Sequence, residues 1–86
     1  MHRKWVASPY YRAVIDTLRS ARLEADVSQR QLAQRLGKPP SFVNKIELIE
    51  RRMDILEFIA FANAIGIAPS TLMARLIAVL PDSFEI

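Results

Sequence analysis

Four residues near the middle of the chain recur at the spacing i, i+3, i+4 and i+7: Ser41, Asn44, Lys45 and Leu48. On an α-helix this spacing places them on one face. The Ser41 hydroxyl and the Asn44 amide can hydrogen-bond to the edges of nucleic-acid bases, and the Lys45 ammonium can reach a guanine or a phosphate. The alternative is an ordinary solvated helix face. The chemistry indicated is recognition, without any making or breaking of bonds.

Catalytic chemistry is not indicated by the remaining residues. The one histidine, His2, lies at the N-terminus, and the chain has no cysteine. No phosphate-binding glycine loop, nucleophile–base pair or metal-ligand cluster can be assembled. We therefore expect no catalytic residues, no metal, no cofactor and no enzymatic activity.

The elements that would position the polar face lie within residues 29–48. Two short apolar stripes are separated by Gly37, which can take the positive φ that ends a helix and turns the chain. The apolar positions are Leu32, Ala33 and Leu36 before the turn, and Val43 and Ile46 after it. The small side chain at position 33 would let the helices cross closely. This is the pattern of a helix-turn-helix, whose second helix enters the DNA major groove.

Capping and proline signals predict three more helices around this motif. We expect helices over 9–25, 29–36, 40–48, 54–65 and 69–80. In the first, Val14, Ile15, Leu18 and Leu23 are predicted to be buried, and Arg12, Arg19 and Arg22 to be exposed. Residues 1–86 would form a single all-α domain of five helices, with a basic leader at 1–7.

Charge divides unevenly along the chain. Residues 1–52 hold eleven of the twelve Lys and Arg against five acidic residues, a balance of +6, whereas residues 53–86 have a balance of −3. The basic part coincides with the helix-turn-helix, which favours a polyanionic partner. The chain has no apolar run long enough for a membrane span and no signal peptide, so we expect a cytoplasmic, nucleoid-associated protein that does not bind membranes.

Five segments carry a recognisable pattern: LRSAR at 18–22, VSQRQLAQRLG at 27–37, SFVNKIE at 41–47, RxxDxxEF at 51–58 and AxAIGI at 62–67. Together they resemble the Cro/phage-repressor family of XRE-type helix-turn-helix regulators, over about residues 18–76. The resemblance implies a five-helix, lambda-repressor-like DNA-binding domain. The chain departs from the family where Pro39 and Pro40 replace a hydroxyl cap and a glutamine, and where Ile49 replaces a glycine. Base readout must therefore shift to other side chains; our candidates are Pro40, Ser41, Asn44 and Lys45.

Contacts with the DNA backbone have their own candidates: Gln29, Phe42, Arg51 and Arg52. By the resemblance, Gln29 would clamp the backbone from the start of its helix. Phe42 could touch a sugar or a thymine methyl, or could simply pack in the core. Arg51 could flank the groove or pair with Glu47 or Glu50, and Glu47 is expected to orient a helix or bind an arginine. A short arm of Arg3 and Lys4 could reach DNA or remain solvated.

These features predict a sequence-specific regulator of transcription that binds double-stranded DNA, most simply a repressor on an inverted repeat (a palindromic operator). Two alternatives are an antitoxin-type repressor with a protein partner and a protein-interaction module that does not bind DNA. No effector pocket or second domain is visible in the sequence.

A homodimer would double the base contacts of one small domain. The candidates for its interface lie in the helix 5 and C-terminal segment, 69–86: Leu72, Met73, Leu76, Ile77 and Leu80. A surplus of apolar residues on one helix indicates a partner surface. Alternatively, Phe84 and Ile86 fold back and cover this surface, which would leave a monomer.

Overall fold

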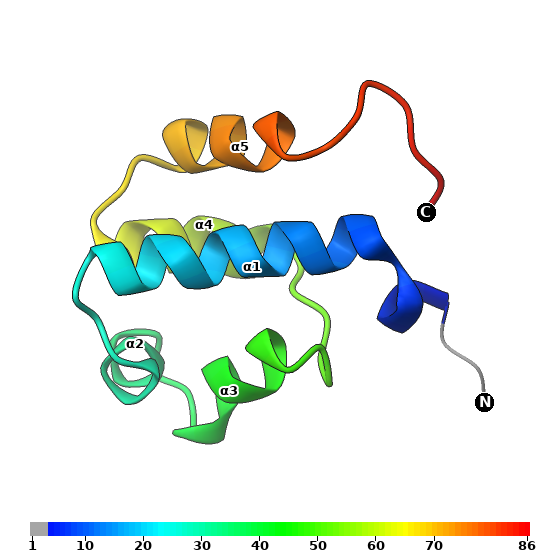
Figure 1. Ribbon diagram of the computed structural model, residues 1–86. Coiled ribbons are helices and arrows are strands. Elements are labelled where there is room, and N and C mark those ends of the chain that lie inside the picture. Colours follow the sequence, from blue (N-terminus) through cyan, green and yellow to red (C-terminus); the bar gives the residue numbers. More distant parts are fainter. Residues whose placement is uncertain (1–3) are drawn as a thin grey trace.

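The computed structural model describes residues 4–86 (Figure 1). Its elements are η1 (Lys4–Ala7, a 3-10 turn), α1 (Pro9–Glu24), α2 (Gln29–Arg35), α3 (Ser41–Glu47), α4 (Ile55–Ile65) and α5 (Pro69–Ala78). These residues include five α-helices and no strand, which confirms the all-α class predicted from the sequence. No single helix in this range is long and apolar enough to cross a membrane, and α4 and α5, which would suffice together by length and composition, are bent by 110°.

Helix α1 runs through the middle of the fold (Figure 1). It packs against α3 on one side and α5 on the other, while α2 contacts both α3 and α4. The largest side chains that are fully buried between them are Ile15, Leu32, Val43, Phe61 and Leu72. Because α3 contributes only seven residues, its position depends on this shared core more than on its own helical stability.

Three helices begin where the capping signals predicted. Ser8 Oγ accepts a hydrogen bond from Tyr11 N at the start of α1, and Pro9 follows as the first helical residue. Ser28 and Asp54 each form a complete capping box, the first with Gln31 and the second with Glu57. These boxes satisfy amides that a helix start leaves without partners.

Helices α1 to α4 end with residues in the left-handed conformation: Asp26, Gly37, Ile49 and Gly66. After α3, Glu50 N donates to Lys45 O and Ile49 N donates to Ile46 O, which is a Schellman closure. At position 49 a β-branched residue has φ +59°, a backbone conformation that glycine adopts far more easily. The Ile49 side chain is buried, so its burial offsets part of this strain. The Schellman closure therefore forms here although position 49 is a β-branched residue and not a glycine.

The predicted buried side of α1 is wrong at its C-terminal end. Leu23 is 51% exposed and Arg22 only 5% exposed. Ile15, Leu18 and Arg22 follow the spacing i, i+3 and i+7, so Arg22 lies on the core stripe and Leu23 lies off it. The helical position decides which side chain is buried, and Arg22 finds a charged partner there.

Candidate nucleic-acid interface

Helix α3 presents opposite faces to the protein and to solvent. Phe42, Val43 and Ile46 are buried against the neighbouring helices. Ser41, Asn44 and Lys45 are exposed, and so is Leu48 just after the helix. The structure thus brings together the residues that the helical spacing grouped. Ala33 of α2 is also fully buried, at the helix that α3 packs against.

The start of α3 lacks the usual hydroxyl cap. Pro40 occupies the capping position with φ −55° and ψ −29°, and no side chain caps the helix. The turn is closed instead by Phe42 N, which donates to Pro39 O at 3.0 Å. Both prolines are exposed, so position 40 offers an apolar surface beside Ser41. The apolar side chain of Pro40 can contact a thymine methyl group or a sugar, but it cannot form the hydrogen bonds that distinguish one base from another.

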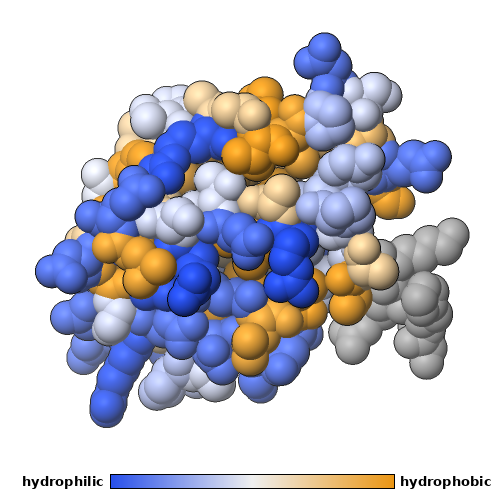
Figure 2. Space-filling model, viewed as in Figure 1, coloured by the Kyte–Doolittle hydropathy of each residue, from blue (hydrophilic) through white to orange (hydrophobic). Residues whose placement is uncertain are grey.

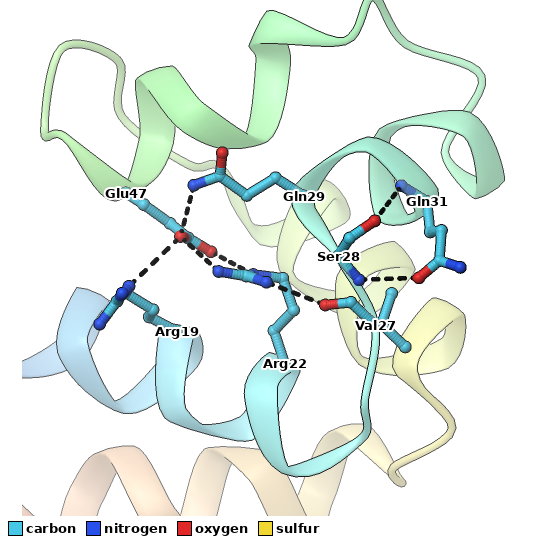
Figure 3. Close-up of polar contacts among 7 residues, drawn as sticks. All are labelled: Arg19, Arg22, Val27, Ser28, Gln29, Gln31 and Glu47. Carbon is cyan, nitrogen blue, oxygen red and sulfur yellow. Dashed lines mark hydrogen bonds and ion pairs between the residues drawn. The ribbon is translucent and has the colours of Figure 1, made fainter.

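Glu47 at the end of α3 joins three helices (Figure 3). Arg22 Nε donates to Glu47 Oε2 at 2.7 Å, and Arg22 Nη2 donates to Oε1 at 2.9 Å. Both side chains are almost fully buried, and Arg22 Nη1 also donates to Val27 O. The exposed Arg19 approaches the same carboxylate at 3.8 Å. This bidentate, hydrogen-bonded pair fixes α3 against α1, as expected for a glutamate that orients a helix.

Gln29 lies at the first position of α2, directly after the Ser28 cap. Its Nε2 donates to Glu47 Oε1 at 2.9 Å (Figure 3). An amide nitrogen carries two hydrogens, so one N–H is engaged with Glu47 and the other can still be donated. Glu47 therefore holds the side chain that the family resemblance places on the DNA backbone.

Phe42 is a core residue, only 9% exposed. Two cations lie against this ring: Lys38 Nζ at 5.4 Å and Arg51 Cζ at 4.7 Å from its centroid. Of the two roles considered for Phe42, packing in the core is favoured over contact with DNA, because so little of the residue can reach a sugar or a base. Sequence reasoning missed Lys38, whose position in the turn before two prolines was the available signal. Phe42 thus gathers two positive charges, one from the turn before α3 and one from the loop after it, beside its ring.

Arg51 forms an ion pair with Glu57, a partner that was not predicted from the sequence. Its guanidinium donates to both carboxylate oxygens of Glu57, at 2.8 and 2.7 Å, and to the carbonyl of Arg52. The alternative that Arg51 pairs with Glu47 or Glu50 is not found; its partner is Glu57, at the start of α4. The hydrogen bond from Arg51 lowers the pKa of Glu57, and the same bond raises the pKa of Arg51.

Arg52 points elsewhere. Its guanidinium lies over the rings of Trp5 and Tyr11, at 5.3 and 5.4 Å from their centroids. It thus faces η1 and the start of α1, so the structure separates Arg51 from Arg52 although the chain makes them neighbours. Arg3 lies outside the described residues, and of Lys4 only the backbone, at the start of η1, is described.

The five candidates for the dimer interface differ in burial. Leu72 and Leu76 are core residues, so they offer no surface to a partner, and their placement in the interface is corrected. Met73 and Ile77 remain 43% and 63% exposed, and Leu80 is half-buried. Phe84 folds back onto Tyr10, with ring centroids 5.5 Å apart, while Ile86 is fully exposed. These two residues therefore leave Met73 and Ile77 open to solvent.

Polar side chains gather over α2 and the lower left of the molecule in the space-filling view, while apolar side chains are scattered as separate patches (Figure 2). The exposed face of α3, the amide of Gln29 and the two cations beside Phe42 form one polar and basic arrangement. Such an arrangement can hydrogen-bond to bases and neutralise phosphates. Helix α5 lies across α1 from this arrangement (Figure 1).

Comparisons with known proteins agree with this geometry. A family model described as helix-turn-helix matches residues 18–72. Among solved structures, the chain is similar to an XRE-family like protein from Pseudomonas syringae pv. tomato str. DC3000, with 46% identity and a TM-score of 0.76. That match covers 84% of this chain and 88% of the other. No protein with a curated description matches the chain. The chain belongs to the XRE-type helix-turn-helix family, whose members are DNA-binding regulators.

Proposed function

We propose that this DNA-binding regulator acts as a repressor, reading a palindromic operator with α3 in the major groove. The observation that carries the proposal is the division of α3 into a buried apolar side and an exposed polar side. Ser41, Asn44 and Lys45 are the proposed base readers, with Pro40 beside them. Asn44 is the natural partner of an adenine and Lys45 of a guanine.

Contacts with phosphates are assigned to the residues around α3. Gln29 donates its remaining N–H from one side, while Lys38 and Arg51 contribute charge from the turn and from the loop after α3. These contacts fix the register of the protein on the duplex but carry no sequence information. Arg52 is the weakest of the proposed backbone candidates, since its guanidinium is directed toward Trp5 and Tyr11.

The operator is proposed to be an inverted repeat bound by a homodimer. The exposed side of α5 offers Met73 and Ile77, one helical turn apart, for a two-fold contact. Dimerisation would place two copies of α3 about 34 Å apart, facing successive major grooves. Each copy alone offers few base contacts, so the symmetric site supplies the affinity that a single α3 lacks.

Selection of duplexes from a random library tests the proposal directly. We expect enrichment of a palindrome, and an affinity for it that falls steeply as salt rises, because Lys and Arg contacts release counterions. Asn44→Ala should reduce the preference for this palindrome over a scrambled duplex by about 1–3 kcal/mol. Arg51→Ala should weaken binding to both duplexes by a similar factor.

Arg75→Ala is the matched control for loss of a cation. Arg75 pairs with Glu24 at an exposed site on α5, away from α3, so its loss should change neither affinity nor salt dependence. Equal losses on palindrome and scrambled DNA for Asn44→Ala would show that another face reads the bases.

A protein-binding role is the second candidate, and one observation favours it. Ile55 and Leu56, at the start of α4, are among the most exposed large apolar residues of the chain. An antitoxin-type repressor would bind its protein partner with such a surface in addition to binding DNA. A protein-interaction module would use this surface and would not bind DNA. If the library selection enriches no duplex and the affinity for DNA does not depend on salt, the protein-interaction module would be favoured over the DNA-binding regulator.

A further inference from the structure

A hollow of about 460 Å³ lies where the two ends of the described chain meet the start of α1. The C-terminal segment after α5 curves back toward η1 and the first turn of α1 (Figure 1). The hollow's main walls are Trp5, Tyr10, Tyr11, Leu80 and Phe84, and Arg52 also lines it. Its volume falls in the range of ordinary small-molecule sites, which are about 300–1,000 Å³. The sequence alone did not reveal this hollow.

Two aromatic pairs line this hollow. Trp5 and Tyr11 meet edge to face, with ring centroids 5.3 Å apart. Tyr10 and Phe84 lie 5.5 Å apart at a tilt of 40°. All four rings remain partly exposed, so they have surface left for a further ring. Aromatic side chains of this kind favour a planar, apolar guest.

Arg52 gives the hollow a charge preference. Its guanidinium stacks on Trp5 and Tyr11, and no carboxylate within residues 4–86 forms an ion pair with it. A guanidinium held by stacking keeps its N–H edge for a bidentate carboxylate. A cationic guest would be repelled by the charge of Arg52. Glu85 also lines the hollow, and both Arg52 and Glu85 are exposed; Glu85 forms no ion pair with Arg52.

We propose that this hollow is an effector site for a small aromatic carboxylate, with its ring among the four aromatic side chains and its carboxylate on Arg52. The effect on DNA binding rests on the proposed function, whereas the binding itself does not. A ring joined to a carboxylate by a short linker matches both features of the hollow.

A direct path connects the hollow to the DNA-reading helix. Tyr11 Oη accepts a hydrogen bond from Met53 N at 3.3 Å, in the loop that follows α3. The adjacent Arg51 in the same loop holds Phe42 and Glu57. A guest that moves Arg52 or Tyr11 therefore pulls on the segment that fixes the end of α3. We expect an effector to change operator affinity through this loop.

Binding can be measured without DNA, because Trp5 is the only tryptophan and lines the hollow. The probes are phenylpropanoate, its uncharged amide and phenylpropylammonium. We expect a saturable change in tryptophan fluorescence with phenylpropanoate and binding weaker by roughly tenfold or more for the amide, because it lacks the charged hydrogen bonds. Phenylpropylammonium should not bind. Equal affinity for acid and amide, or no saturable change with the acid, would overturn the proposal.

Arg52→Gln tests the charge and Phe84→Ala tests the aromatic wall; each should weaken phenylpropanoate binding by roughly tenfold. Arg75→Gln, which removes a cation distant from the hollow, should bind as the parent protein does. Circular dichroism of each variant separates loss of the site from loss of the fold. Unchanged binding in the folded Arg52→Gln variant would refute the site. If phenylpropanoate binds and operator affinity stays the same, the effector role is refuted and the DNA-binding proposal stands.

Discussion

Arg22 Nε and Glu47 Oε2 lie 2.7 Å apart, at the buried junction of α1 and α3. The two residues are 25 positions apart in the chain, so this contact exists only in the folded protein. Glu47 also binds Gln29, which ties the start of α2 to the same point. Glu47 therefore helps to fix the orientation of α3, the helix proposed to read DNA.

Loss of this carboxylate should be costly. Glu47→Gln leaves the Arg22 guanidinium buried without a counter-charge, and we expect the free energy of unfolding to fall by about 3–5 kcal/mol. Urea unfolding followed by circular dichroism measures the change. Glu24→Gln, which breaks the exposed pair with Arg75, should change the free energy by less than about 1 kcal/mol. Similar losses in both variants would show that the buried pair is not special.

Acid should weaken the fold through Glu57. Arg51 holds the pKa of the folded Glu57 below its ordinary value of about 4.3, so folding favours the ionised form. The resulting stabilisation is present above the unfolded pKa and is lost as pH falls toward the lowered folded pKa. Glu57→Gln should therefore flatten the dependence of unfolding free energy on pH below about 4.3. A flat profile in the parent protein would contradict the argument.

Local signals in the sequence were sufficient for the helices and for the exposed face of α3. Capping boxes and apolar spacing depend only on residues a few positions apart, so Ser28, Asp54 and Asn44 could be interpreted from the sequence. Partners distant in the chain could not be chosen this way. Arg22 with Glu47, and Arg51 with Glu57, are pairs set by packing of the helices. The hollow near Trp5 likewise forms only where η1 and the C-terminal segment approach each other in the fold.

The left-handed backbone at Ile49 leads to an unusual order of stabilities. Ile49→Ala and Ile49→Gly both lose the same buried side chain, but glycine also relieves the positive φ. We expect Ile49→Gly to be more stable than Ile49→Ala by about 1 kcal/mol, from the cost of the left-handed conformation. At Ala60, an exposed position inside α4, Ala→Gly should instead destabilise the protein by about 1 kcal/mol. Urea unfolding of the three variants measures this order. If Ile49→Ala were more stable than Ile49→Gly, the left-handed backbone at position 49 would not be strained.

The exposed side of α5 leads to a prediction about the oligomeric state of the protein. Ile77 is exposed and Leu76 is buried, although they are adjacent in the chain. Ile77→Asp should therefore convert the proposed dimer into a folded monomer, because a charge at a two-fold contact meets its own copy. Leu76→Asp should unfold the protein, because it buries an unpaired carboxylate in the core. Light scattering with circular dichroism separates these results, since one variant loses mass and the other loses helix. A monomeric mass for the parent protein at tens of micromolar, equal to that of Ile77→Asp, would exclude the dimer.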